Sequence, residues 1–331
     1  MKKTNTIIAS SILVAAMAFS SCVPAKTEAD DVTESINPTE VTALASPETN
    51  NTESADLPDS TECIETSGEK VLLIDNGTLG ESEFDYSYDI TKTIIETVDE
   101  SKVGTEKTIE FMGKQYKLLY ERTRYGVLLS IKVDDYKIVE AEGEYADEIG
   151  YIDLLPDGTI YSIIANPIFS IDIQSCKSGE DVRALVEESL KDEIDFSKYE
   201  HYSIVEPDEE AAFYFYSISW NNSIDNITLC DSAAVMVDTE GGIRGIRMKD
   251  RVDFGYDTLP DDLSLDDYLP QIESKLKKIY GDAFVDYEVK SSFVGNIDGN
   301  LCIICDVDAD YNDKQNEKTY DQIELAVFIN Q

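Results

Sequence analysis

Residues 178–194 read SGEDVRALVEESLKDEI, and this stretch decides the fold. Ser178 with Asp181 three positions later has the pattern of a capping box, which starts a helix by satisfying free backbone amides. The apolar residues that follow recur every three or four positions and form one stripe: Val182, Leu185, Val186, Leu190 and Ile194. The stretch therefore predicts an amphipathic helix with one face against a core.

A second stretch, LSLDDYLPQIESKLKKIYG at residues 263–281, has the same period. Gly281 is a typical helix stop. Pro270 limits the continuous helix to the residues after it, unless the proline lies in the first turn. The apolar stripe consists of Leu265, Tyr268, Leu269, Ile272, Leu276 and Ile279.

Most of the remaining chain from residue 69 onward has the alternation and composition of β-strands, separated by Gly, Asn, Asp and Pro. Strands joined by tight turns pair antiparallel, so we expect an α+β fold with antiparallel sheets, each packed by an amphipathic helix. The predicted strands are 106–111, 114–122, 127–133, 136–142, 212–220, 227–237, 242–248, 283–294, 301–307 and 322–329.

Two segments, 151–163 and 235–246, share the pattern acid-Gly-x-Ile-x-small-Ile. Gly158 and Gly241 occupy the turn, where glycine supplies the positive φ of a tight hairpin. A hairpin alone generates part of this likeness. The predicted helices at 179–195 and 264–280, each followed by strands, favour repeated modules of altered length.

The first helix, the strand AFYFYSISW at 212–220 and a D-x-A-x-V-x-V-D-x-x-G-x-I hairpin together resemble the PepSY-like repeat domains of exported Gram-positive proteins. The resemblance covers residues 178–252 and extends in weaker form over 264–330, although the alanine-rich helix start of that family is missing. It implies an extracytoplasmic accessory module that restrains peptidases or binds envelope ligands, without a catalytic residue set. The matching residues are Asp231, Ala233, Val235, Val237, Asp238, Gly241 and Ile243.

The first 22 residues have the layout of a bacterial lipoprotein signal peptide: two lysines, the apolar run 7–19 and the sequence Phe-Ser-Ser before Cys22. We expect a lipid anchor such as diacylglycerol or palmitate on Cys22, although Phe19 replaces the usual leucine of the lipobox. The alternative is an ordinary secretory signal cut near residue 18. Either way, the signal predicts export; the anchored form lies on the extracytoplasmic face of the bacterial cell membrane.

Residues 23–68 are rich in Thr, Ser, Glu, Asp, Asn and Pro and lack apolar periodicity, which is typical of a disordered linker. The expected organisation is a signal peptide at 1–21, a lipid anchor with a disordered acidic linker at 22–68, a mostly antiparallel β domain at 69–175, a helix-plus-sheet PepSY-like module at 176–257 and a second such module at 258–331.

Residues 69–331 hold 57 acidic and 24 basic residues, a net charge of −33. A field of that sign repels phosphates and anionic headgroups, so we expect no nucleic-acid partner and no contact with a membrane except through the lipid anchor. Cations, basic peptides and cationic polymers remain compatible with it. Solubility at a crowded surface is the simplest role of the charge.

No catalytic constellation stands out. His201 is the single histidine, which excludes a zinc site built on several histidines. Nothing near it in the sequence resembles a nucleophile elbow. Cys302 and Cys305 have CxxC spacing, but in a strand their sulfurs point to opposite faces, beyond disulfide reach. We expect them to be buried apolar residues. The pairing of Cys63, Cys176 and Cys230 stays open.

One segment has the spacing of a calcium loop, with acidic or amide side chains at positions 1, 3, 5, 7 and 12. Position 6 is Tyr311 where such loops need glycine, and no helix precedes it. The alternative is the solvent face of a strand that ends in a polar turn. The five residues are Asp306, Asp308, Asp310, Asn312 and Glu317. Calcium is the only cofactor that the sequence suggests.

Aromatic side chains gather in residues 213–220, where Tyr214, Tyr216 and Trp220 fall on one face. Such a face suits a platform for a sugar ring, whereas a strand buried on both sides has the same composition.

We therefore expect a non-enzymatic cell-surface lipoprotein that binds a wall polymer or an extracytoplasmic protein, such as a peptidase that it regulates. The alternatives are a solute- or glycan-binding lipoprotein, which requires a cleft lined by aromatics, and a hydrolase, which requires two carboxyls that face one pocket. The oligomeric state stays open.

Overall fold

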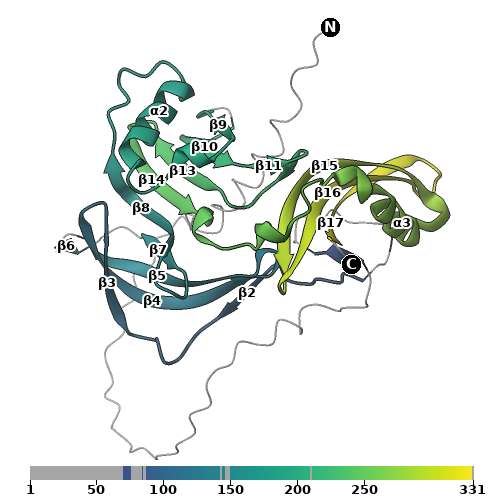
Figure 1. Cartoon of the computed structure of the whole chain (residues 1–331), viewed down its shortest axis with the longest axis horizontal. Helices are drawn as coiled ribbons and strands as arrows, with labels where there is room; N and C mark the ends of the chain where they lie inside the picture. Colours follow the sequence, from purple (N-terminus) through teal and green to yellow (C-terminus); the bar gives the residue numbers. More distant parts are fainter. Residues whose placement is uncertain are drawn as a thin grey trace, which may run out of the picture.

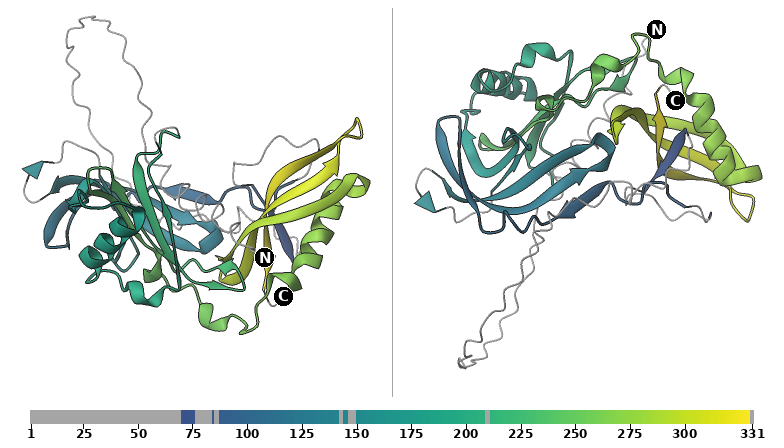
Figure 2. Two further views of the ribbon diagram at one scale, coloured as in Figure 1. Left: turned by 90° about the horizontal axis from the view of Figure 1, so that it is seen from above. Right: turned by 60° about the horizontal axis from the view of Figure 1, so that its bottom comes forward.

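The computed structural model describes residues 70–75, 84, 87–141, 144–145, 150–208 and 211–329. In these residues the chain is a mixed α+β protein with two mostly antiparallel sheets and two α-helices, which confirms the predicted class. Figure 1 and Figure 2 show the two sheets side by side, the larger in blue to green on the left of Figure 1 and the smaller, mainly in yellow-green, on the right.

The large sheet has 11 strands in the order β2-β4-β5-β7-β8-β14-β13-β10-β9, with β3 paired to β4 and β6 to β5. Its strands are β2 (Ile94–Thr97), β3 (Glu106–Phe111), β4 (Lys114–Gly126), β5 (Ile131–Ala141), β6 (Glu144–Tyr145), β7 (Tyr151–Leu154), β8 (Ile160–Ser170), β9 (His201–Val205), β10 (Phe215–Asn221), β13 (Ala233–Asp238) and β14 (Gly242–Met248).

The small sheet has six strands in the order β1-β17-β16-β15-β12-β11. All neighbours pair antiparallel except β12 and β15, which pair in parallel. Its strands are β1 (Val71–Ile74), β11 (Ser223–Ile224), β12 (Ile227–Thr228), β15 (Phe284–Ile297), β16 (Asn300–Asn312) and β17 (Lys318–Phe328).

Helix α2 (Gly179–Leu190) begins at the predicted cap. The Ser178 side chain accepts a hydrogen bond from the Asp181 amide, and the Asp181 carboxylate accepts one from the Lys177 amide. The apolar stripe of the helix lies in the core of the large sheet, as does Trp220 of β10. The buried residues of the stripe are Val182, Val186 and Leu190.

Helix α3 (Leu269–Tyr280) has Pro270 in its first turn, and a short 3-10 turn at Leu265–Asp267 precedes it. The proline is tolerated there because first-turn amides have no partner within the helix. Gly281 follows the last residue at a positive φ of 56°. The buried side chains Ile272, Leu276 and Tyr280 join the core of the small sheet.

The two segments with a shared turn pattern form the hairpins β7–β8 and β13–β14, with Gly158 and Gly241 at φ values of 89° and 90°. The hairpins lie side by side because β8 pairs antiparallel with β14. Ile163 faces Ile246 in that pair, and both are fully buried. Ile163 and Ile246 hold the same place in the two sequence segments, so the two hairpins meet at an equivalent position.

Strand pairing does not follow the expected domain boundaries. The large sheet continues across residue 175 through the β8–β14 pair, and β1 joins the C-terminal strand β17. The β11–β12 hairpin leaves the large sheet between β10 and β13 and adds to the small one.

Two strand predictions are wrong. Residues 227–237 were expected to form one strand, but they contribute β12 and β13, which belong to different sheets. Residues 127–133 were expected to be extended, but Val127–Leu129 forms a 3-10 turn, η3, and Ser130 has a φ of 50°. Tertiary contacts override the β composition here, because the turn sits against β15. The Ser130 hydroxyl donates to the Asn296 carbonyl at 2.8 Å and accepts from the Asp298 amide at 3.0 Å. This contact, the η3–β15 joint, links the two sheets.

Candidate functional site

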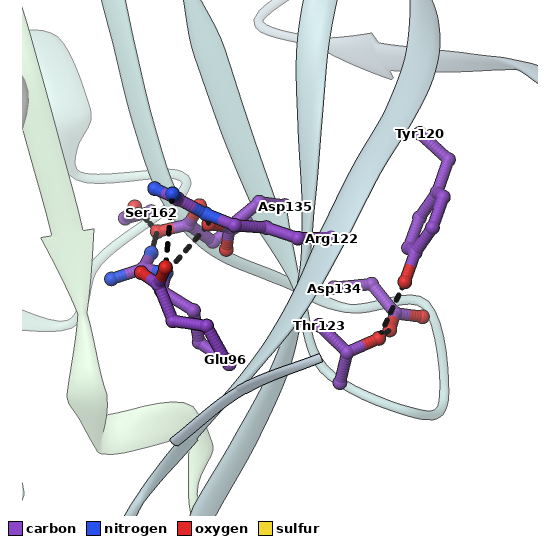
Figure 3. Close-up of polar contacts among 9 residues, drawn as sticks. Glu96, Tyr120, Arg122, Thr123, Asp134, Asp135 and Ser162 are labelled. Carbon is purple, nitrogen blue, oxygen red and sulfur yellow. Dashed lines mark hydrogen bonds and ion pairs between the residues drawn. The ribbon is translucent and has the colours of Figure 1, made fainter. Parts of the chain in front are cut away.

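A network of buried charges crosses four neighbouring strands of the large sheet (Figure 3). Arg124 on β4 donates from Nε to Asp135 Oδ2 on β5 at 2.6 Å, and from Nη2 to Asp153 Oδ2 on β7 at 2.9 Å. Asp153 also accepts a hydrogen bond from the Ser162 hydroxyl on β8. We call these four residues the arginine–aspartate network.

Arg122 extends the network to the edge of the sheet. Its Nε lies 2.9 Å from Asp135 Oδ2, and its Nη1 lies 3.3 Å from Glu96 on β2. A bulge between Tyr120 and Arg122 changes the alternation of β4. Both arginines therefore leave the face of the sheet that carries the Leu118 and Tyr120 core.

The carboxylates of the network are hidden from water, since the side chains of Asp135 and Asp153 are only 5% and 10% exposed. Burial raises the pKa of Asp153, and the charge of Arg124 offsets only part of that effect. Burial also lowers the pKa of Arg124, but Asp153 and Asp135 outweigh it and the pKa is raised. The network therefore keeps a charged guanidinium between two acids.

A second polar cluster lies beside the first, on the right of Figure 3. The Asp134 carboxylate accepts from the Thr123 hydroxyl at 2.7 Å and from Lys102 at 2.8 Å. The Tyr120 hydroxyl lies 2.9 Å from the Thr123 hydroxyl and accepts from the Asp99 amide at 3.0 Å. These bonds hold the turn before β3 on the sheet.

Both clusters bind their polar groups to one another, and the hydroxyls that donate to their carboxylates, those of Ser162 and Thr123, are buried in the sheet. The two buried carboxyls Asp135 and Asp153 share one guanidinium, so they differ from the open acid pair that a hydrolase requires. Their chemistry is that of an internal ion-pair network, which fixes strand register.

The other polar residues singled out from sequence lie apart from this network. His201 is exposed at the start of β9 and bonds Ser223 through Nε2 at 3.1 Å. Cys302 and Cys305 lie in separate cores on opposite faces of β16, as expected from alternation. Burial raises the pKa of both thiols, that of Cys305 to about 12. The described cysteines, Cys176 and Cys230 included, are unpaired with one another.

The calcium-loop candidates do not form a loop. Asp306, Asp308, Asp310 and Asn312 belong to strand β16, and the residues between them are buried. Consecutive acids on such a strand are about 6.6 Å apart, so the first and last do not share one cation. Asp306 accepts a hydrogen bond from Ser291, and Asp308 and Asp310 form ion pairs with Lys290 and Lys318. Glu317 lies in the following turn, where its amide donates to Asp313. Among the described residues no group of three or more metal-ligating side chains comes together.

The aromatic platform is also absent from the described surface. Trp220 is 2% exposed, packs on Phe196 at 4.6 Å between ring centroids and donates from its indole N–H to Glu187 at 2.8 Å. Tyr214 is 55% exposed, whereas Tyr216 packs partly against the core. Trp220 is thus a core residue and offers no face to a sugar ring.

The lipidation candidate Cys22 and the linker lie outside the described residues. Within the described part, neither helix has the length and apolarity needed to cross a membrane.

Sequence reasoning missed the arginine–aspartate network. Its signal was the presence of charged residues inside strand-like runs: Arg122 and Arg124 in 114–126, Asp135 in 131–141 and Asp153 in 151–154. No protein-family model matches the chain, and neither a curated protein nor a solved structure shows significant similarity to it.

Proposed function

We propose that this protein is a non-enzymatic lipoprotein, anchored through Cys22 on the extracytoplasmic face of a bacterial membrane, that binds a cationic extracytoplasmic protein. The charge distribution carries the proposal. Five arginines form ion pairs with carboxylates of the large sheet, of helix α2 or of the segment that follows α2. They are Arg122, Arg124, Arg183, Arg244 and Arg251.

Most acids, by contrast, face solvent. Only five carboxylates are buried in the described residues, and residues 69–331 have 57 acids in total. The surface is therefore strongly negative, because the acids far outnumber the paired arginines. Such a field draws in cationic partners and repels anionic ones.

The PepSY-like assignment belongs to this proposal. Each helix precedes antiparallel strands of one sheet, α2 before β9, β10, β13 and β14, and α3 before β15–β17. Buried residues of each helix lie in the core of that sheet. These parallels support two repeated modules of unequal length. By the same resemblance, the bound partner is an extracytoplasmic peptidase that the protein restrains.

The binding proposal is tested with the full chain in a mild detergent. Polylysine should bind, with an affinity that falls steeply as salt is raised, because exposed charges are screened within about 10 Å at 0.1 M ionic strength. Polyglutamate is the matched control. Equal binding of both polymers, or binding of neither, would contradict the proposal.

Two further measurements test the lipid anchor and the class of the bound partner. Labelling with a fatty-acid analogue should be lost in Cys22→Ala, and persistent labelling would refute the anchor. Crosslinking in native envelopes should recover a basic protein. A partner that survives protease digestion of the envelope would be a wall polymer instead.

A further inference from the structure

Strand β9 is the last strand of the large sheet on the side of helix α2. It pairs with β10 over five residues, His201–Val205. No other described strand pairs with its outer edge, since the sheet order ends at β9. A terminal strand presents a row of outward amides and carbonyls that another extended chain can pair with.

The two edges of the large sheet differ in how they are protected. At the far edge, β3 reads EKTIEF and carries Glu106, Lys107 and Glu110, all exposed. Charges of both signs along an edge discourage pairing by another strand. Strand β9 reads HYSIV and has neither a lysine, a carboxylate nor a proline. Its edge therefore lacks the usual barriers to strand addition.

Strand β9 is also held in place before any partner arrives. The Ser203 hydroxyl lies 2.8 Å from that of Ser219 on β10. The Tyr202 hydroxyl donates to Glu180 of α2 at 3.1 Å, and the Arg183 guanidinium stacks on the Tyr202 ring at 4.2 Å. Glu206, just after the strand, accepts from the Gly179 amide at 2.7 Å. Because β9 is already ordered, pairing of a partner strand with it costs little conformational entropy of this chain.

Acidic side chains flank this edge. Glu200 precedes the strand with a side chain 71% exposed, and Glu206 follows it. Glu180 beside Tyr202 is 54% exposed and shares its carboxylate with Arg183, which lies 3.0 Å away. A second copy of the chain would bring the same acids and the same net charge, so the field opposes pairing of two β9 strands. A basic segment meets an attractive field at the same place.

We infer that β9 is the docking strand for an extended, lysine- or arginine-rich segment of the partner, which adds to the large sheet as its next strand. This inference rests on the proposed function and names its surface. Backbone hydrogen bonds supply the pairing, and Glu180, Glu200 and Glu206 select basic side chains.

The probe is a short peptide of alternating lysine and valine, added to the full chain. Its control has the same sequence with every second backbone nitrogen methylated, which keeps the charge but removes the amide hydrogens on one edge. Because several hydrogen bonds of roughly 1 kcal/mol each are lost, the methylated peptide should bind at least about tenfold more weakly. Hydrogen exchange should show new protection at residues 201–205.

Proline substitution locates the site. Neighbouring residues of an antiparallel strand direct their amides to opposite sides, so one of Tyr202→Pro and Ser203→Pro removes an outward amide and the other breaks a bond to β10. The variant whose thermal midpoint is preserved is the informative one, and it should lose at least about tenfold in affinity. Lys107→Pro and Thr108→Pro, at the exposed positions of β3, are the matched controls and should keep full affinity.

The outcomes separate the two proposals. Equal binding of the methylated peptide, or protection at the β3 edge instead of β9, overturns the docking strand and leaves a cationic partner intact. Absence of binding by both the peptide and polylysine overturns both. Loss of binding through methylation and through the β9 proline, with the β3 controls unchanged, supports the docking strand.

Discussion

The two sheets stabilise their buried carboxyl groups in different ways, one with a positive charge and the other with hydrogen bonds from hydroxyls. In the large sheet Asp135 and Asp153 contact the guanidinium of Arg124, which stays charged at every physiological pH. The small sheet has no arginine, because none occurs in residues 71–74, 223–228 or 284–328. There the buried Asp321 on β17 accepts hydrogen bonds from two neutral donors, the hydroxyls of Tyr280 and Tyr311, at 3.0 and 3.1 Å.

This difference indicates how each sheet should respond to mutation. A guanidinium compensates charge, so the loss of Arg124 leaves the buried Asp153 without a counterion and Asp135 with Arg122 alone. A hydroxyl supplies one hydrogen bond, so its loss weakens the solvation of an acid that still has a second donor. We therefore expect larger effects in the large sheet than in the small one.

The largest effect should follow Arg124→Ala. Breaking a buried ion pair by removing one partner costs about 3–5 kcal/mol in the free energy of unfolding. Urea denaturation measures it. Lys277→Ala, which removes an exposed ion pair of α3, is the control and should change stability by less than about 1 kcal/mol.

The triple variant Arg124→Met, Asp135→Asn, Asp153→Asn should regain part of the loss, because it removes the charges together. An Arg124→Ala loss no larger than that of the control would refute the role of the network.

In the small sheet, Tyr280→Phe removes one donor to Asp321 and keeps the ring that stacks on Tyr311 at 5.1 Å. Hydrogen bonds to a charged group contribute about 1.5–3 kcal/mol, so this variant should lose less than Arg124→Ala. Tyr311→Phe should behave alike, and a double-mutant cycle in urea measures their coupling. A loss that exceeds that of Arg124→Ala would reverse the comparison.

Gly295→Ala probes the η3–β15 joint between the sheets. An added Cβ would lie 2.7 Å from the Leu128 carbonyl oxygen and 2.7 Å from Ile304 Cδ1. Such overpacking costs about 1–3 kcal/mol. Gly126→Ala is the control, because its Cβ would meet only the Ile131 carbonyl oxygen at 3.8 Å. Thermal unfolding of both variants measures the difference, and equal midpoints would show that the joint tolerates a methyl group.

The smallest effect concerns Asp306, whose pKa is raised by burial and only partly lowered by the Ser291 hydroxyl. The folded state then holds the proton more tightly than the unfolded chain, whose value is near 3.8. Stability therefore falls as the pH rises from the unfolded to the folded pKa, and stays reduced above it. Asp306→Asn should raise the thermal midpoint at pH 7 and have no such effect near pH 3. A lower midpoint at pH 7 would contradict this sign.

Local structure could be predicted from the sequence where a short pattern of neighbouring residues determines it. Ser178 and Asp181 mark the start of α2, and Met112 with Gly113, both at positive φ, form the predicted turn between β3 and β4. Alternation also placed the acids of 306–310 on one side of β16.

Pairing between distant strands was not readable. Strand β1 is a run of four buried residues, too short for a period, and only its partner β17 identifies it as a strand. The arginine–aspartate network depends on the register of β4, β5 and β7, which single strands do not encode. The turn at Val127–Leu129 depends on contacts with β15, more than 160 residues away.

The pairing of β1 with β17 also sets an order of assembly. The strands of the large sheet all lie within residues 94–248, so that sheet is able to close before the rest of the chain is available. The small sheet cannot be completed at that stage, because its first described strand, β1, pairs with its last, β17. Long-range pairing of this kind is slow. The small sheet is therefore complete only once β17 is available, and a chain truncated before β17 leaves β1 without its strand partner.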